Sequence, residues 1–202
     1  MENDFTFFIP ENIRTIANAF QHSKILLTAI ELDLFSVIDK HMLTSNEVSQ
    51  KLNTDERATD RLMNALYTMG FLRKVRGKFY NTESSSQYLV KGKPDFMGGL
   101  YHSIGLWNSW SYLTESVRKG SCVELDISKK KSVDWNEAFI SAMHYRGQHQ
   151  AKIICLLLNL SNVNRILDVG GGSGAFTFEF LKTSNTIDAV IFDLPSIIPI
   201  TK

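Results

Sequence analysis

Residues 165–180, RILDVGGGSGAFTFEF, decide the fold of this chain. Arg165–Val169 is a short and mostly apolar run, which suits a buried parallel strand. A glycine-rich turn at 170–174 follows it directly, and AFTFEF after the turn predicts a helix. A second apolar run at 189–192 ends at Asp193. Strand, glycine turn, helix, strand and acid are typical of the first βαβ unit of a nucleotide-binding domain.

Each residue type in this unit has a physical task. Glycines permit positive φ angles and let a ligand approach the backbone where a Cβ atom would collide with it. The turn directs free N–H groups toward the ligand. An acid at the end of the second strand can accept hydrogen bonds from ribose hydroxyls. Asp193 lies 19 residues after Gly174, close to the spacing of roughly 20 that such sites use.

Two cofactor classes fit the turn. Gly170, Gly172 and Ala175 satisfy the dinucleotide pattern G-x-G-x-x-G/A. Asp168, Gly170, Gly172 and Gly174 satisfy the acid-led pattern D-x-G-x-G-x-G of S-adenosylmethionine (SAM) sites. A carboxylate two residues before the first glycine would repel a pyrophosphate, whereas it suits the cationic methionine end of SAM. Asp168 therefore favours SAM over NAD, and a glycine turn without a ligand is the remaining alternative.

The first half of the chain predicts helices and one hairpin. Apolar residues spaced by three and four over 11–39 indicate amphipathic helices. Thr44 to Glu47 is a capping signal for a short helix, and a second helix stops at Gly70. Two short strands surround Gly77. Helix, turn, helix and hairpin in this order predict a winged-helix-like module.

DNA binding is the first function that such a module suggests. In its second helix, however, acids outnumber bases: Asp55, Glu56 and Asp60 stand against Arg57 and Arg61. A helix that enters the major groove should present cations and polar donors instead. The hairpin is basic, but a single basic wing is common on solvated surfaces. A structural or dimer-forming role is the better interpretation, and no nucleic-acid partner is predicted.

Composition excludes several other classes. The 202 residues contain 22 Lys+Arg and 21 Asp+Glu, and a net charge of +1 gives no reason to expect a polyanion or a membrane surface as partner. No run approaches the roughly 18 to 20 apolar residues of a membrane span. Two cysteines, and histidines without metal-ligand spacing, predict no metal site and a reducing, cytoplasmic setting. Further helices are predicted over 100–120 and 135–160.

Several stretches together resemble one known family. ILDVGGGSG followed by VIFDLPSII is the sharpest match, and LTSNEVSQKL, LMNALYTMGFL, LWNSWSYLTESVRKG and FISAM support it. These segments resemble the two-domain small-molecule O-methyltransferases, which include plant caffeate and flavonoid enzymes and bacterial polyketide and phenazine enzymes. The resemblance covers nearly all of the chain.

The resemblance implies a mainly α, winged-helix-like dimerisation domain over 1–160, followed over 161–202 by the first βαβ unit of an α/β, Rossmann-like SAM domain, which would be incomplete. The chain would form a homodimer, and the complete enzyme would act on a small hydroxylated, aromatic acceptor. The implied cofactor-binding residues are Asp168, Gly170, Gly171, Gly172, Gly174, Asp193 and Leu194. The implied substrate-pocket residues are Trp107, Phe139, Met143 and Arg146, with Trp110 as a further aromatic. Core packing is the alternative for the two tryptophans, Phe139 and Met143, whereas Arg146 would approach the SAM carboxylate.

The family's catalytic base is a histidine far downstream in a His-Asp-Trp-like motif. None of the five histidines here stands in that context, so the base is expected beyond Lys202 and the chain alone is expected to be inactive. His144 is the one candidate substitute, and it is expected to be a solvated helix residue. A non-catalytic dimerisation or binding module and an NAD-dependent oxidoreductase remain as alternatives.

Overall fold

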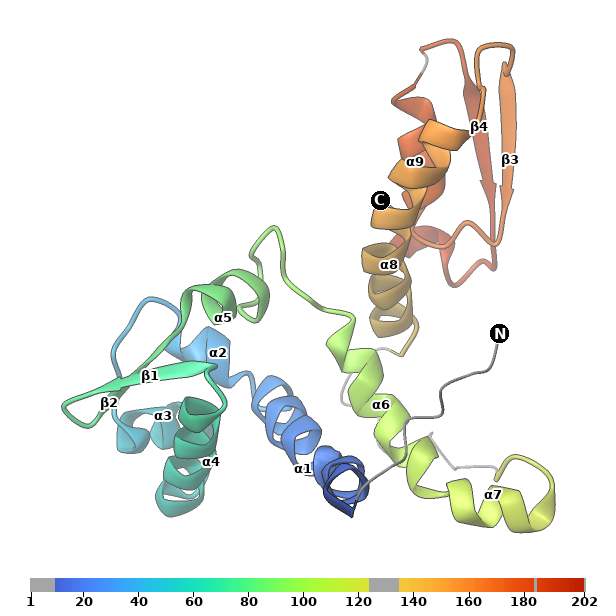
Figure 1. The fold of residues 1–202 in the computed structure, drawn as a ribbon. Coiled ribbons are helices and arrows are strands. Elements are labelled where there is room, and N and C mark those ends of the chain that lie inside the picture. The colour runs from blue at the N-terminus through green and yellow to red at the C-terminus, as the bar shows by residue number, and fades with distance from the viewer. Residues whose placement is uncertain (1–9, 124–134, 184, 202) are drawn as a thin grey trace. The chain divides into compact units, whose positions relative to one another are not determined.

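The computed structural model describes residues 10–123, 135–183 and 185–201. The chain forms two compact units, Met1–Phe96 and Met97–Lys202, which are described separately (Figure 1).

The first unit is helical with one small hairpin. Its helices and strands are α1 (Pro10–Glu31), α2 (Leu34–Ile38), α3 (Ser45–Leu52), α4 (Glu56–Thr68), β1 (Leu72–Val75), β2 (Lys78–Asn81) and α5 (Glu83–Tyr88). The core of this unit collects apolar side chains from α1, α2, α3, α4 and the hairpin: Leu27, Ile30, Leu34, Phe35, Ile38, Val48, Met63, Leu66, Leu72 and Phe79.

Local signals in the sequence explain the order of these elements. Thr44 caps α3 in the predicted capping box, because its hydroxyl accepts the Glu47 N–H while the Glu47 carboxylate accepts the Thr44 N–H. Strands β1 and β2 pair antiparallel around the turn at Gly77, which has a φ angle of 78°. The predicted succession of helix, helix and hairpin is confirmed.

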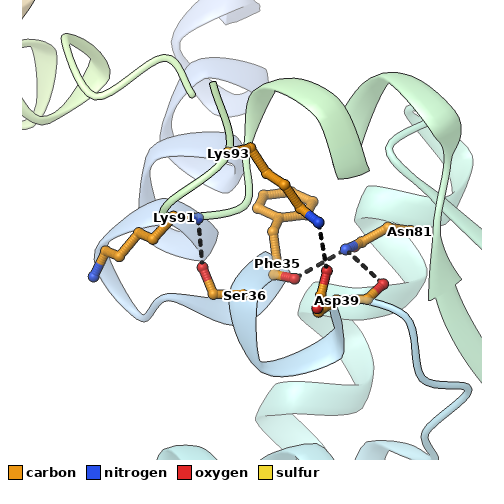
Figure 2. A network of polar contacts seen from close by, with 6 residues as sticks. All are labelled: Phe35, Ser36, Asp39, Asn81, Lys91 and Lys93. Carbon is orange, nitrogen blue, oxygen red and sulfur yellow. Dashed lines mark hydrogen bonds and ion pairs between the residues drawn. The ribbon is translucent and has the colours of Figure 1, made fainter. Parts of the chain in front are cut away.

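A buried amide joins the hairpin to the end of α2 (Figure 2). The side-chain N–H₂ of Asn81 donates to the Phe35 carbonyl at 2.9 Å and to the Asp39 carbonyl at 3.4 Å. Lys93 Nζ lies 3.5 Å from the Asp39 carboxylate. Asn81 is buried, so it supplies hydrogen bonds to helix-terminal carbonyls that water reaches poorly.

The second unit contains the predicted βαβ segment. Its elements are α6 (Leu100–Ser111), α7 (Leu113–Lys119), α8 (Trp135–Leu157), β3 (Arg165–Val169), α9 (Ala175–Leu181), β4 (Asp188–Phe192) and a 3₁₀ turn at Ile198–Ile200. Strands β3 and β4 are parallel, in a register from Arg165 opposite Asp188 to Val169 opposite Phe192. Strand, glycine turn, helix and strand therefore occur as predicted.

The helix predicted over 100–120 is interrupted. Tyr112 has φ −99° and ψ 9°, and its N–H bonds to the Ser109 carbonyl at 3.2 Å in a tightened turn. The Tyr112 carbonyl then accepts the Ser116 N–H at 3.0 Å, which begins α7. The prediction of one continuous helix was wrong here, because a local i−3 hydrogen bond replaces the i−4 bond of an α-helix.

The two faces of the β3–β4 sheet differ in exposure. Ile191 lies on the face toward α9. A Cβ atom added to Gly174 would lie 2.9 Å from Ile191 Cδ1 and 2.8 Å from the Phe178 ring of α9, so these two side chains meet beside the turn. The opposite face carries four apolar side chains that are 57–69% exposed, Leu167, Val169, Val190 and Phe192. Alternation along each strand produces this division, and it leaves one apolar sheet face open to solvent in this chain.

The compact units divide the chain at a different place from the predicted boundary at residue 160. Helix α8 packs on α6 and on α9, so 97–157 belongs to the same compact unit as the sheet. The division into a dimerisation domain over 1–160 and a SAM domain over 161–202 stays a prediction.

Candidate cofactor site

The glycine turn after β3 has the backbone that its sequence predicts. Gly170, Gly172 and Gly174 have φ angles of 73°, 54° and 74°, in the left-handed region that favours glycine. The Gly170 N–H donates to the Phe192 carbonyl at 2.7 Å, so the turn begins directly at the end of the paired strands. The Gly174 N–H closes the turn on the Gly171 carbonyl at 2.8 Å.

Asp193, directly after β4, is brought to this turn. Its Oδ2 accepts the Gly172 N–H at 2.8 Å, and its Oδ1 accepts the Leu194 N–H at 2.7 Å. Both oxygens are therefore held in place, and each carboxylate oxygen has further lone pairs for other donors. Gly172 of the turn and Asp193 after β4 are 21 residues apart in sequence, and this hydrogen bond brings them together at the carboxyl end of the sheet.

Asp168 lies half-buried beneath the turn. Its Oδ2 accepts the hydroxyl of Thr177, a buried residue of α9, at 2.6 Å. A Cβ atom added to Gly171 would lie 2.9 Å from the Asp168 carboxyl carbon and 2.8 Å from Ile191 Cγ2. Gly171 is thus required by close packing, and the Asp168 carboxylate has a fixed orientation. The sequence analysis did not identify Thr177 as part of the site. The only signal was its position on the side of α9 that faces the sheet.

A further hydroxyl holds the middle of the turn. Thr201 Oγ1 donates to the Gly172 carbonyl at 2.6 Å. The backbone of Gly172 is therefore held at its N–H by Asp193 and at its C=O by Thr201. No local pattern marks Thr201, since it is 29 residues from its partner.

His144 does not stand where it was predicted. It was expected to be a solvated helix residue, but it is half-buried on α8 and its Nδ1 lies 2.7 Å from Ser173 Oγ of the glycine turn. Burial lowers the pKa of His144 below its ordinary value. The prediction was wrong because the helical pattern does not reveal which side of α8 the turn covers.

Phe139, Met143 and Arg146 share one face of α8, as spacings of four and three require. The Phe139 ring makes an edge contact with His102 of α6, with centroids 5.3 Å apart. Burial, and secondarily the charge of Arg146, lower the pKa of His102. The structure therefore brings Phe139 into contact with α6 and places the charge of Arg146 near enough to act on His102. The binding role predicted for them stays a prediction.

The two tryptophans of α6 differ. Trp107 is half-buried, whereas Trp110 is 66% exposed. Core packing within this chain therefore does not explain Trp110.

Two absences hold for the described part of the chain. Residues 10–123, 135–183 and 185–201 contain no group of three or more His, Cys, Asp or Glu side chains that could hold a metal ion. Within the same ranges, every helix is too short or too polar to cross a membrane.

Two family models match the chain. The O-methyltransferase dimerisation domain matches residues 15–91, and the O-methyltransferase domain matches residues 110–202. The two matches cover most of both compact units.

Curated relatives agree with these models. The chain is 27% identical over 194 residues to a 3-hydroxy-5-methyl-1-naphthoate 3-O-methyltransferase of Streptomyces sahachiroi, covering 93% of this chain and 56% of the relative. It is 29% identical over 210 residues to the acetylserotonin O-methyltransferase of Bos taurus, covering 94% of this chain and 60% of the relative. The chain thus spans somewhat more than half the length of these relatives.

A solved structure shows the same fold. Human N-acetylserotonin methyltransferase, in complex with SAM, superposes with a TM-score of 0.79 at 22% identity, covering 98% of this chain and 63% of the other. The chain therefore belongs to the O-methyltransferase family in which a dimerisation domain precedes the methyltransferase domain.

Proposed function

We propose that this chain carries the dimerisation and SAM-binding parts of a methyltransferase that acts on a hydroxyl group of a small aromatic molecule. The observation that carries the proposal is the Asp193 carboxylate, held at 2.8 Å against the N–H of Gly172 in the glycine turn. A fixed strand-end acid beside a glycine turn suits a ligand with a ribose. The relatives named above methylate small hydroxylated aromatic molecules, which supports the acceptor class.

In the proposed site, Asp193 accepts hydrogen bonds from the ribose hydroxyls, with Leu194 beside it. At Gly170 the ligand can approach the backbone, because the space where its Cβ atom would stand is open. At Gly174 the missing Cβ atom instead makes room for Phe178 and Ile191. Asp168 would act on the cationic methionine end, either directly or through water. Bound SAM supplies a sulfonium methyl group for transfer to an acceptor oxygen. The residues of this chain hold the methyl donor in position. Positioning of the reactants supplies a large share of the rate acceleration in such transfers.

Further polypeptide is proposed to complete the methyltransferase domain. The sheet face formed by Leu167, Val169, Val190 and Phe192 is apolar and exposed. Two parallel strands do not make an independent doubly wound sheet, and apolar faces of this kind are normally covered. The base that takes the acceptor proton, and most of the acceptor pocket, are proposed to lie in that further polypeptide.

The homodimer is proposed to use the first unit. Ile13, Ile16 and Phe20 follow one another on α1 at spacings of three and four, and all three are exposed. Helices α3 and α4 with the β1–β2 hairpin form a winged-helix-like module, and the matching family model describes a dimerisation domain. An exposed apolar stripe on a long helix supports contact with a second copy.

Calorimetric titration of the chain with S-adenosylhomocysteine (SAH) and, separately, with NAD⁺ tests the cofactor. The proposal predicts heat of binding with SAH and none with NAD⁺. Binding of NAD⁺ in preference to SAH would contradict it and would favour an oxidoreductase. Binding of neither at millimolar ligand would favour a non-catalytic module.

A further inference from the structure

The contact between His144 and Ser173 has no part in the SAM site as proposed so far. Ser173 lies within the turn, between Gly172 and Gly174. Its hydroxyl lies 2.7 Å from Nδ1 of His144, which is 29 residues away on α8. The turn is thus held from three separate segments: by Asp193 after β4, by Thr201 near the 3₁₀ turn, and by His144.

The side of α8 that carries His144 is packed against the turn and α9. Ile140, one turn earlier, is buried, and its Cδ1 lies 3.4 Å from where a Gly172 Cβ would stand. Gly147, nearly one turn later, approaches so closely that an added Cβ would lie 3.1 Å from Ala175 Cβ. Ala151 continues the row and is fully buried. His144 is therefore presented to Ser173 by a fixed helix face.

A turn with three glycines at positive φ has many alternative conformations, and fixing it costs conformational entropy. A hydrogen bond from a rigid helix to the one residue of the turn with a polar side chain reduces that freedom before the ligand arrives. Preorganisation of this kind raises affinity without adding a ligand contact.

We propose that His144 is a positioning residue that holds the glycine turn, through Ser173, in the conformation that receives SAM. This inference rests on the proposed SAM site. It also assigns a second task to α8: one face contacts α6 through Phe139, and the other sets the shape of the turn.

The test is a double-mutant cycle of His144→Ala and Ser173→Ala in this chain. Amide hydrogen exchange of Gly172, Ser173 and Gly174, followed by NMR without ligand, reports on the turn itself. SAH affinity, from chemical-shift titration to millimolar ligand, reports on the site. One hydrogen bond predicts exchange faster, and SAH binding weaker, by about two- to tenfold in each single variant. The double variant should lose no more than either single one.

Two further variants separate positioning from general packing. His144→Asn places an amide near the position of Nδ1 and should restore slow exchange and SAH affinity. Gln148→Ala, on an exposed site one turn along α8, should behave as the wild type. Circular dichroism of each variant checks that the chain remains folded, and the asparagine variant answers the question if the alanine variant unfolds.

The outcomes are distinguishable. Wild-type exchange and wild-type SAH affinity in both single variants would overturn the positioning role while leaving the proposed SAM site intact. Additive losses in the double variant would also overturn it, because the two residues would then act independently. Absence of any SAH-dependent shift in the wild type would refute the proposed function, and the assignment to SAM would fall with it.

Discussion

Replacement of Asp193 by alanine is the most informative perturbation of the proposed site. The substitution removes the acceptor of the Gly172 N–H at 2.8 Å and of the Leu194 N–H at 2.7 Å. It also removes the proposed partner of the ribose hydroxyls. We therefore expect the turn to lose one of its three side-chain supports together with the ligand's principal polar contact.

The magnitude follows from the kind of hydrogen bond lost. Bonds to a charged acceptor contribute about 1.5 to 3 kcal/mol. Asp193 is partly exposed, so we take this range for the whole substitution rather than for each bond. SAH affinity should fall roughly 10- to 150-fold. Asp193→Asn should also weaken binding, because its amide N–H₂ would face one of the two backbone N–H donors.

Titration of the chain with SAH, by calorimetry or NMR, measures this change. Asp188→Ala is the matched control, since Asp188 is an exposed acid at the opposite end of β4. The control should bind SAH as the wild type does. Equal affinity of the wild type and Asp193→Ala would refute the assignment of Asp193 to the ribose.

Three further predictions concern stability and assembly. Asn81→Ala should lower the free energy of unfolding by about 1 to 3 kcal/mol, because it leaves the carbonyls of Phe35 and Asp39 with fewer hydrogen-bond donors. Urea denaturation measures this change, and an unchanged midpoint would contradict it. Burial lowers the pKa of His144 and His102 from 6.5, so the unfolded state binds more protons below that pH. Stability should be complete above about pH 6.5 and fall as the pH decreases, with a smaller decrease in His144→Asn; tryptophan fluorescence in urea at pH 5 to 7.5 tests the sign. Ile16→Glu should convert the homodimer to a monomer in light scattering, and a wild-type monomer at micromolar concentration would contradict the proposed interface.

The sequence predicts those parts of the structure that depend on neighbouring residues. The capping box of Thr44 and Glu47 is a contact over three positions, and it forms as predicted. The βαβ unit is equally local, because apolar runs on both sides of a glycine turn leave few other arrangements. Asp193 could be placed beside the turn for the same reason: parallel strands bring their carboxyl ends to one edge.

Contacts between distant segments could not be predicted in this way. Thr177, Thr201 and His144 each hold the turn or the acid beneath it, yet each is a common residue without a distinctive pattern. Their roles depend on how α8, α9 and the segment after β4 pack around the turn. The break at Tyr112 was missed for a related reason, since neither glycine nor proline marks it.

The central claim is that SAM binds at the glycine turn between β3 and α9. The most direct measurement is an NMR titration of the isotope-labelled chain with SAH in which each shifted backbone amide is assigned. The largest shifts are expected at Gly170, Gly172, Gly174 and Leu194, with Gly77 of the hairpin unchanged. Shifts that leave these amides unmoved and gather elsewhere would contradict it.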